Sequence, residues 1–108
     1  MGRITNERMM VLLKIYLSKI KKFFSIDKFI IFGSRARGDY FLDSDIDLIV
    51  VSKDFEDINF RKRMGILLEW WEGPVDLEVL CYTLQEFERK KKQIGIVKQA
   101  VKDGIYLL

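Results

Sequence analysis

The segment KFIIFGSRARGDYFLDSDIDLIVV, residues 28–51, carries the strongest structural signals in this chain. Its two ends, Lys28–Phe32 and Ile46–Val51, are short runs rich in aromatic and β-branched residues, which is typical of strands. Both runs are almost continuously apolar towards their centres, so we expect the two strands to be covered on both faces of a sheet. The polar, turn-forming segment between them begins at Gly33. The segment therefore predicts two strands joined by a polar connection.

Helical spacing is found on both sides of these strands. Apolar residues recur every three or four positions over residues 9–24, and Thr5 or Asn6 can cap the start of that helix. The same spacing returns over residues 57–71 and ends at Gly73-Pro74, because proline cannot continue a helix. Two helices are therefore expected to cover the sheet.

The last third of the chain predicts one more strand and one more helix. Residues 75–82 begin with alternating apolar and acidic residues, as a strand would. Thr83 and Glu86 form a capping box, and the helix that follows is expected to break near Gly95 and to end at Gly104. The expected order is αββαβα, which describes a small mixed β-sheet flanked by helices in an α/β (α+β) fold.

Length and composition restrict the chemistry that this chain can perform. Its 108 residues allow one modest core and hence a single domain, residues 1–108. The absence of histidine excludes a Ser-His-Asp triad, a histidine base and histidine-ligated zinc. The only cysteine, Cys81, excludes an intrachain disulfide and is interpreted as a small core side chain.

Location and partners are less strongly indicated. The start of the chain does not resemble a signal peptide and no apolar run is long enough to span a membrane, so we expect a cytoplasmic protein. The net charge of +3 is too small to argue for a nucleic-acid partner. The basic run Arg89–Lys92 could bind phosphate or RNA, but such a run is more often a solvated helix face, which is the interpretation we favour.

The most informative residues are Asp45 and Asp47, at the start of the second predicted strand. Because they are two positions apart, both carboxylates point to the same face of the strand, where they repel each other. A divalent cation such as Mg²⁺ would relieve that repulsion, since hard cations prefer carboxylate oxygens. Asp76 and Glu78 form a second such pair on the third predicted strand, and a carboxylate of this pair joins the first if the two strands are neighbours.

Other interpretations of these acids are open at this point. An isolated Asp-x-Asp pair is more often a pair of solvated side chains at a sheet edge. A calcium-binding loop beginning at Asp43 is a weaker alternative, because Leu48 stands where such a loop needs glycine and a hydrophobic strand follows.

A second feature lies directly after the first predicted strand. Gly33 lets the backbone approach a bulky anion, and a helical turn beginning at Ser34 would offer N–H groups and a hydroxyl to it. Arg35 and Arg37 add cations nearby. The segment is not a Walker A loop, because it lacks the closing Lys-Ser/Thr, and a lone Gly-Ser is most often only a tight turn. Together with the acidic pair, however, it predicts a phosphate-binding turn next to a metal site.

The segment GSRARGDYFLDSDIDL, residues 33–48, resembles the signature of the DNA polymerase β-type nucleotidyltransferases, and in particular of their minimal members, the MNT proteins. Ten residues separate Gly33-Ser34 from Asp45-x-Asp47, which matches the spacing of the family motif. The resemblance extends over nearly the whole chain, with the third-strand sequence VDLE at the position of the family's third acid.

The resemblance implies roles for the turn residues. Gly33 and Ser34 would bind the β- and γ-phosphates of ATP or another nucleoside triphosphate, and Arg35 and Arg37 would be further nucleotide-binding residues. The implied reaction is attack of an acceptor hydroxyl on the α-phosphorus with pyrophosphate as the leaving group, which is the chemistry of an EC 2.7.7 transferase.

The resemblance also implies roles for the acids. Asp45 and Asp47 would bind two Mg²⁺ ions, for which Mn²⁺ is a possible replacement. Asp76 matches the third catalytic and metal-binding acid, and Glu78 on the same strand face is its substitute.

The acceptor would have to come from another chain, because too few residues follow the third predicted strand to form the helical acceptor domain of longer members. The resemblance implies a HEPN-type partner protein, to which the chain would be the antitoxin of a toxin–antitoxin pair, or a second copy in a homo-oligomer. The alternative is a non-catalytic module that neutralises its partner by direct contact, with a vestigial or regulatory nucleotide site. The adjacent Trp70 and Trp71 cannot both face the same core direction, so either one of them is exposed for such a contact or, as is more usual, both are partly buried at a helix end.

Overall fold

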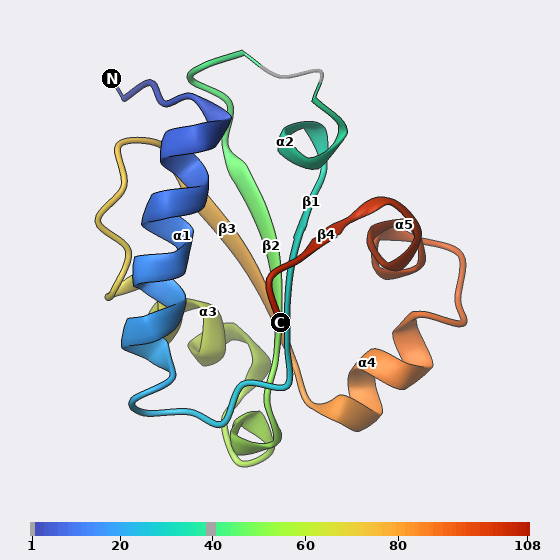
Figure 1. Cartoon of the computed structure of the whole chain (residues 1–108). Helices are drawn as coiled ribbons and strands as arrows, with labels where there is room; N and C mark the ends of the chain where they lie inside the picture. Colours follow the sequence, from blue (N-terminus) through green and yellow to red (C-terminus); the bar gives the residue numbers. More distant parts are fainter. Residues whose placement is uncertain (1, 39–40) are drawn as a thin grey trace.

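A computed structural model describes residues 2–38 and 41–108 and has a mixed four-stranded sheet at its centre (Figure 1). The strands are β1 (Lys28–Phe32), β2 (Ile46–Val51), β3 (Leu77–Tyr82) and β4 (Ile105–Tyr106), arranged in the order β3-β2-β1-β4. Strand β1 is antiparallel to β2 and to β4, whereas β2 and β3 are parallel. The expected mixed sheet is confirmed, and β2 and β3 are neighbours, which was the condition for the second acidic pair to join the first.

Helices cover both faces of this sheet. They are α1 (Asn6–Ile20), α2 (Ser34–Arg37), α3 (Phe60–Leu68), α4 (Leu84–Lys90) and α5 (Ile96–Asp103), with a 3-10 turn at Lys53–Phe55. Figure 1 shows α1 and α3 on one face, and α4 and α5 on the other. No helix in the described part of the chain combines the length and the apolar character needed to cross a membrane.

The element order differs from the expected αββαβα at three places. The polar connection contains the short helix α2, the last predicted helix is two helices separated by residues 91–95, and the strand β4 follows α5. The elements α2 and β4 are too short to show hydrophobic periodicity, and the separation of α4 from α5 lies at the predicted break near Gly95. The predicted caps are confirmed, with the Thr5 hydroxyl accepting from the Arg8 N–H and the Thr83–Glu86 capping box complete.

The first predicted helix was too long at its C-terminal end. Phe23 and Phe24 continue the apolar spacing, but α1 ends at Ile20. The two rings instead pack beyond the helix, where the ring of Phe23 stacks on Trp70 at a centroid distance of 5.0 Å and Phe24 lies 5.4 Å from Phe55. Phe23 is exposed and Phe24 is half-buried, so the apolar spacing extended the predicted helix beyond its buried face.

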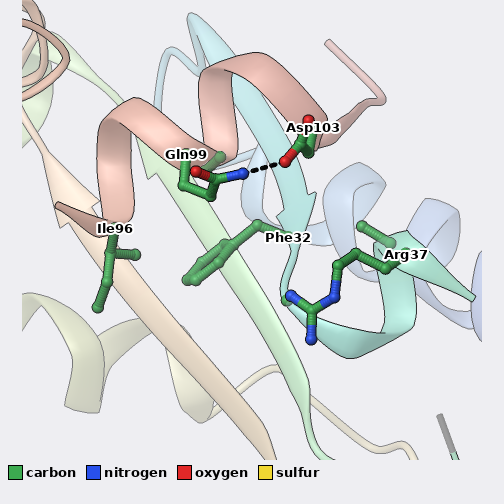
Figure 2. A pocket seen from close by; sticks show the side chains of 8 residues that line it. Phe32, Arg37, Ile96, Gln99 and Asp103 are labelled. Carbon is green, nitrogen blue, oxygen red and sulfur yellow. Dashed lines mark hydrogen bonds between the residues drawn. The ribbon is translucent and has the colours of Figure 1, made fainter. Parts of the chain in front are cut away.

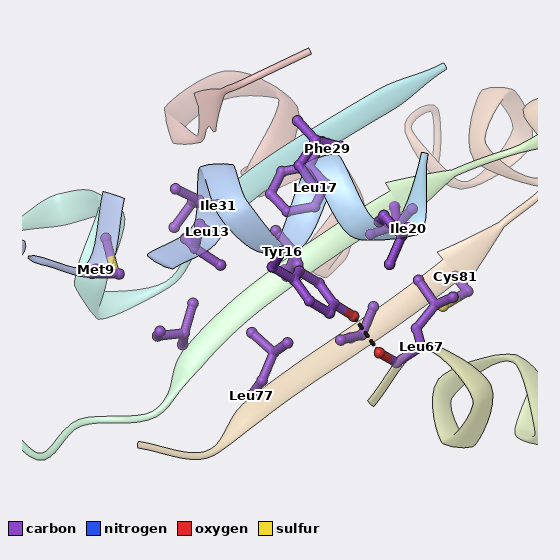
Figure 3. Close-up of a cluster of buried hydrophobic side chains, with 14 of the residues drawn as sticks. Met9, Leu13, Tyr16, Leu17, Ile20, Phe29, Ile31, Leu67, Leu77 and Cys81 are labelled. Atoms are coloured by element: carbon purple, nitrogen blue, oxygen red, sulfur yellow. Dashed lines mark hydrogen bonds between the residues drawn. The ribbon is translucent and has the colours of Figure 1, made fainter. Parts of the chain in front are cut away.

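The larger core lies between the sheet and helices α1 and α3 (Figure 3). At its centre the Tyr16 hydroxyl donates a hydrogen bond of 2.6 Å to the carbonyl oxygen of Leu67. Its ring meets Trp71 edge-on at 5.6 Å, and the Trp71 indole donates to the Val75 carbonyl at 2.8 Å. Both tryptophans are half-buried and pack against this core, so the interpretation that both are partly buried at a helix end is confirmed.

The opposite face of the sheet has a smaller core. Its fully or nearly buried members are Ile30, Ile49, Val51, Tyr82, Phe87, Val97 and Ala100. Because strand side chains alternate, Ile46, Leu48 and Val50 belong to the larger core, while Asp47 shares its face with Ile49 and Val51. Asp47 therefore faces the α4–α5 side, towards the end of the sheet that the smaller core leaves open.

We expect Tyr16→Phe to lower the free energy of unfolding by about 1–3 kcal/mol, because it leaves the buried Leu67 carbonyl without its donor. Tyr106→Phe is the matched control, since the exposed Tyr106 hydroxyl donates to the Val101 carbonyl at 3.4 Å and its loss is expected to cost less than about 0.5 kcal/mol. Urea unfolding of both variants measures the difference. Equal destabilisation by the two substitutions would contradict a structural role for the Tyr16 hydrogen bond.

Candidate active site

The polar connection begins with a turn that only glycine adopts easily. Gly33 has φ 75° and ψ −155°, and α2 starts at the next residue, Ser34. The N–H groups of Ala36 and Arg37 return to the Gly33 carbonyl at 3.1 and 3.2 Å. The helical turn that the sequence predicted after Gly33 is therefore present.

Gly33 lies against the acidic edge of the sheet. A Cβ atom at this position would be 2.3 Å from Oδ2 of Asp47, much closer than atoms can approach. Residues 32 and 47 are partners in the β1–β2 ladder, which explains the contact. Any side chain at position 33 would displace the Asp47 carboxylate, so the turn and the first acidic pair form one site.

The second acidic pair joins the same edge. Asp47 and Glu78 are direct partners in the parallel β2–β3 ladder, so their side chains point to the same face. At the first residue of β2, the Ile46 N–H donates a hydrogen bond of 3.0 Å to the carbonyl of Asp76, the residue before β3. Asp45, Asp76 and Glu78 are exposed, whereas Asp47 is half-buried. The strand register therefore brings all four predicted acids to one end of the sheet.

The environment of Asp47 is unfavourable for a carboxylate. Burial, a hydrogen bond with Glu78 and repulsion from Glu78 and Asp45 raise the pKa of Asp47 from 3.8 to about 6, while Arg37 acts in the opposite direction. The site thus has more negative charge than its own cations offset.

These residues suit a divalent cation. Carboxylate oxygens are hard ligands, and a cation would offset the repulsion around Asp47. Among the described residues no three His, Cys, Asp or Glu side chains are close enough to enclose a metal ion. A protein-only cage is not required for Mg²⁺, which proteins usually bind through one or two carboxylates together with substrate phosphates. The donor set therefore fits a metal that is completed by a phosphorylated substrate.

A small cavity adjoins the turn (Figure 2). It has a volume of about 210 Å³, enough for roughly seven water molecules. Phe32, Gly33, Ala36 and Arg37 form one wall, and Ile96, Gln99, Ala100 and Asp103 of α5 form the other. The Gln99 amide donates a hydrogen bond to the Asp103 carboxylate. This space has room for one part of a nucleotide beside Gly33.

Sequence analysis did not identify the α5 wall of this cavity. Gln99 and Asp103 are four positions apart on an amphipathic helix, and the pattern of polar residues there does not differ from an ordinary solvated face. Their proximity to Gly33 arises only because α5 packs across β1.

Arg35 has a different task from the phosphate-binding one that the sequence suggested. Its side chain is 1 % exposed, and its guanidinium donates to the carbonyls of Ile4, Leu42 and Ser44 at 2.9 to 3.2 Å. It therefore ties α2 to the segment before α1 and to the segment that leads into β2. We do not include Arg35 among the nucleotide-binding residues proposed below.

The remaining sequence interpretations can be compared directly with the structure. Strand β2 begins at Ile46, where a calcium-binding loop would have to turn, so that alternative is wrong. Cys81 is buried in the larger core, which confirms its interpretation as a core side chain.

Comparison with known proteins gives two matches. Residues 13–107 match the profile of the nucleotidyltransferase domain family. The crystal structure of a candidate nucleotidyltransferase from Sulfolobus solfataricus is similar, with a TM-score of 0.69 and 29 % sequence identity over 94 % of this chain and 80 % of that chain. No functionally curated protein matches the sequence.

We expect Asp47→Asn to stabilise the metal-free protein at neutral pH. The raised pKa of about 6 means that folded Asp47 holds its proton more tightly than unfolded Asp47, with its ordinary value of 3.8. The free energy of unfolding therefore falls as the pH rises from 3.8 through about 6, and the amide removes this fall. Thermal melts across this pH range in a chelator would measure it.

The exposed Asp57 supplies the control, because Asp57→Asn is expected to leave the stability profile unchanged. A lower melting temperature for Asp47→Asn than for the native chain at neutral pH would contradict an unfavourable environment at Asp47.

Proposed function

The chain belongs to the nucleotidyltransferase domain family, and from this premise we propose that it transfers AMP from ATP to a hydroxyl group on a partner protein. The observation that carries the proposal is the contact between Gly33 and Asp47, which joins a phosphate-binding turn to an acidic edge. Neither the turn at Gly33 nor the acidic edge would by itself indicate nucleotidyl transfer. Their combination matches what a metal-bridged triphosphate requires.

The turn binds the triphosphate in this proposal. Gly33 allows the phosphates to approach the backbone, and Ser34, the first residue of α2, contributes its hydroxyl. Arg37 borders the adjoining cavity and is near enough to Asp47 to lower its pKa, so it lies close to both the cavity and the acids. It is the arginine that we assign to the β- and γ-phosphates.

The acids bind two Mg²⁺ ions in this proposal, through Asp45, Asp47 and Asp76. When bound, the ions supply charge stabilisation for the attacking and leaving oxygens, and Mn²⁺ can replace them. Glu78 remains the substitute for Asp76 because it is in register with Asp47, whereas Asp76 precedes the strand by one residue.

The reaction is an in-line displacement at the α-phosphorus. The acceptor oxygen forms the new bond to phosphorus, the bond to the oxygen that bridges to the β-phosphate breaks, and pyrophosphate leaves. The hydroxyl proton passes to a site carboxylate or to water. The chain contributes position and charge and forms no covalent bond itself, which is why a protein without histidine can perform this reaction.

The acceptor is proposed to be a HEPN-type partner protein in a toxin–antitoxin pair or a second copy of this chain, as the MNT resemblance implies, and the pair would act in the cytoplasm. The buried thiol of Cys81, in a chain with no other cysteine, is compatible with that compartment.

The transfer reaction is tested with ATP labelled at the α-phosphate, Mg²⁺ and the HEPN-type partner. We expect label on the partner with the native chain, and a loss of at least about a hundredfold with Asp45→Ala/Asp47→Ala, because the metal-binding carboxylates are removed. Asp57→Ala is the control and should retain full activity. Asp76→Asn and Glu78→Gln, compared in the same assay, identify the third acid as the one whose amide loses more activity.

Equal labelling by the native chain and by Asp45→Ala/Asp47→Ala would refute the proposal. Full neutralisation of the partner by that double variant, without any labelling by the native chain, would instead support the non-catalytic binding module.

Metal binding is tested separately by thermal melting without nucleotide and with ATP. At a metal concentration of about ten times Kd we expect stabilisation by about 1.4 kcal/mol, or several degrees for a domain of this size. Asp47→Asn should lose most of this shift, since it removes the half-buried ligand. No shift for the native chain with saturating Mg²⁺ or Mn²⁺, with or without ATP, would contradict the assigned metal site.

A further inference from the structure

A second, larger cavity lies on the same side of the sheet as the acidic edge. It is a groove of about 960 Å³ bounded by β3, by the start of α3 and by the connection between α4 and α5. Figure 1 shows α4 and α5 on the side of the sheet opposite α1. Its floor includes Leu80 and Tyr82 of β3 and Val97 of α5. We refer to it as the α4–α5 groove.

The apolar wall of the α4–α5 groove is unusually exposed. Ile94 is 98 % exposed and Ile96 59 %, and Phe60 at the opposite edge is also exposed. Single exposed apolar residues are common, but three of them around one concave surface are typical of a binding site for an apolar partner.

The rim of the groove is positively charged. Arg89 and Lys90 line it, and no carboxylate of the described residues forms an ion pair with either. The one acidic residue of the groove, Glu86, is already paired with the buried guanidinium of Arg63 at 2.6 Å. That partner and the capping contacts with Thr83 hold the pKa of Glu86 below its ordinary value although burial acts to raise it. Two cations are thus left to attract an acidic ligand.

The groove continues from the candidate active site. Leu80 follows Glu78 by two residues on the same face of β3, a distance of about 7 Å along the strand. Ile96 lines both the groove and the small cavity beside Gly33. A chain segment held in the groove would therefore lie next to the acids and next to the proposed nucleotide.

We propose that the α4–α5 groove binds an acidic, apolar segment of a partner polypeptide and thereby presents the acceptor hydroxyl to the site carboxylates. The apolar residues of the segment contact Leu80, Ile94 and Ile96, and its carboxylates pair with Arg89 and Lys90. The binding of the segment depends only on the groove, whereas its role as acceptor rests on the proposed function.

A polypeptide fits this surface better than a nucleic acid does. Single-stranded nucleic acids stack their bases on open aromatic faces. The two rings of the groove, Phe60 and Tyr82, pack against each other at a centroid distance of 5.7 Å, and the rest of its apolar lining is aliphatic. The net charge of the whole chain, +3, is also small for a nucleic-acid-binding protein.

The test uses three fluorescent probes and fluorescence polarisation. The first is a synthetic peptide of about four helical turns with Leu at helical spacing and Glu between, the second has Lys in place of each Glu, and the third is oligouridylate. We expect saturable binding of the acidic peptide to the native chain and none of the basic peptide. Arg89→Glu/Lys90→Glu and Ile94→Asp should each weaken binding by about tenfold or more.

Lys21→Glu/Lys22→Glu is the matched control, because it makes the same change of net charge at exposed residues near the end of α1, on the other side of the sheet. Its affinity should stay within about twofold of the native value. All these positions are exposed, and thermal melting verifies that each variant is folded.

The proposal is overturned if the acidic peptide does not bind at about 1 mM, or if the control variant loses as much affinity as Arg89→Glu/Lys90→Glu. Binding of oligouridylate that only the groove variants abolish would assign the groove to nucleic acid and also refute it. Asp45→Ala/Asp47→Ala should bind the acidic peptide normally. This separates failure of the groove from failure of the transferase function.

Discussion

The register of β2 between its two neighbours determines the geometry of the site. Asp47 is paired with residue 32 on one side and with Glu78 on the other, so a single position in the sheet brings together the turn after β1 and the acids of β3. A shift by one residue would move Asp47 into the larger core and a hydrophobic side chain to the open face. The apolar residues on both sides of β2 prevent that shift, because each alternate side chain is buried in one of the two cores. The packing of the core and the geometry of the site therefore depend on the same register.

A buried arginine supports the connection that begins with the turn at Gly33. Arg35 donates hydrogen bonds to three carbonyls, one in the segment before α1 and two in the connection between α2 and β2. These hydrogen bonds restrict the conformations of the connection in the free protein. The connection therefore loses less conformational entropy when a ligand binds. Its neighbour Arg37 is exposed and acts on Asp47. Of the two arginines of this short helix, Arg35 therefore supports the structure and Arg37 supplies positive charge near Asp47. The sequence GSRARG alone does not distinguish these two roles.

The elements that could be predicted are those whose signal is local. The three long strands, the caps at Thr5 and Thr83 and the break at Gly95 follow from apolar runs, side-chain oxygens and backbone freedom, and they match the structure within a few residues. The proximity of Gly33 and Asp47 was expected because the spacing of the two motifs matches the family signature and because consecutive strands are usually neighbours in a sheet. The end of α1, the pair β1–β4 and the wall formed by Gln99 and Asp103 depend on tertiary contacts between distant segments, and local patterns carry no information about them.

The break between α4 and α5 explains why the open side of the sheet has two separate cavities. Gly95 has φ 154°, a value that residues with a side chain rarely adopt, and α5 leaves it in a new direction. A continuous helix from residue 84 would carry residues 96–103 away from the β1 side, where α5 now packs. The break turns Gln99 and Asp103 towards the turn at Gly33 and leaves Ile94 exposed beside the larger groove. Residues 91–95 therefore separate the space next to the turn at Gly33 from the surface next to Glu78, which is the arrangement that the proposed transfer from a nucleotide to a macromolecular acceptor requires.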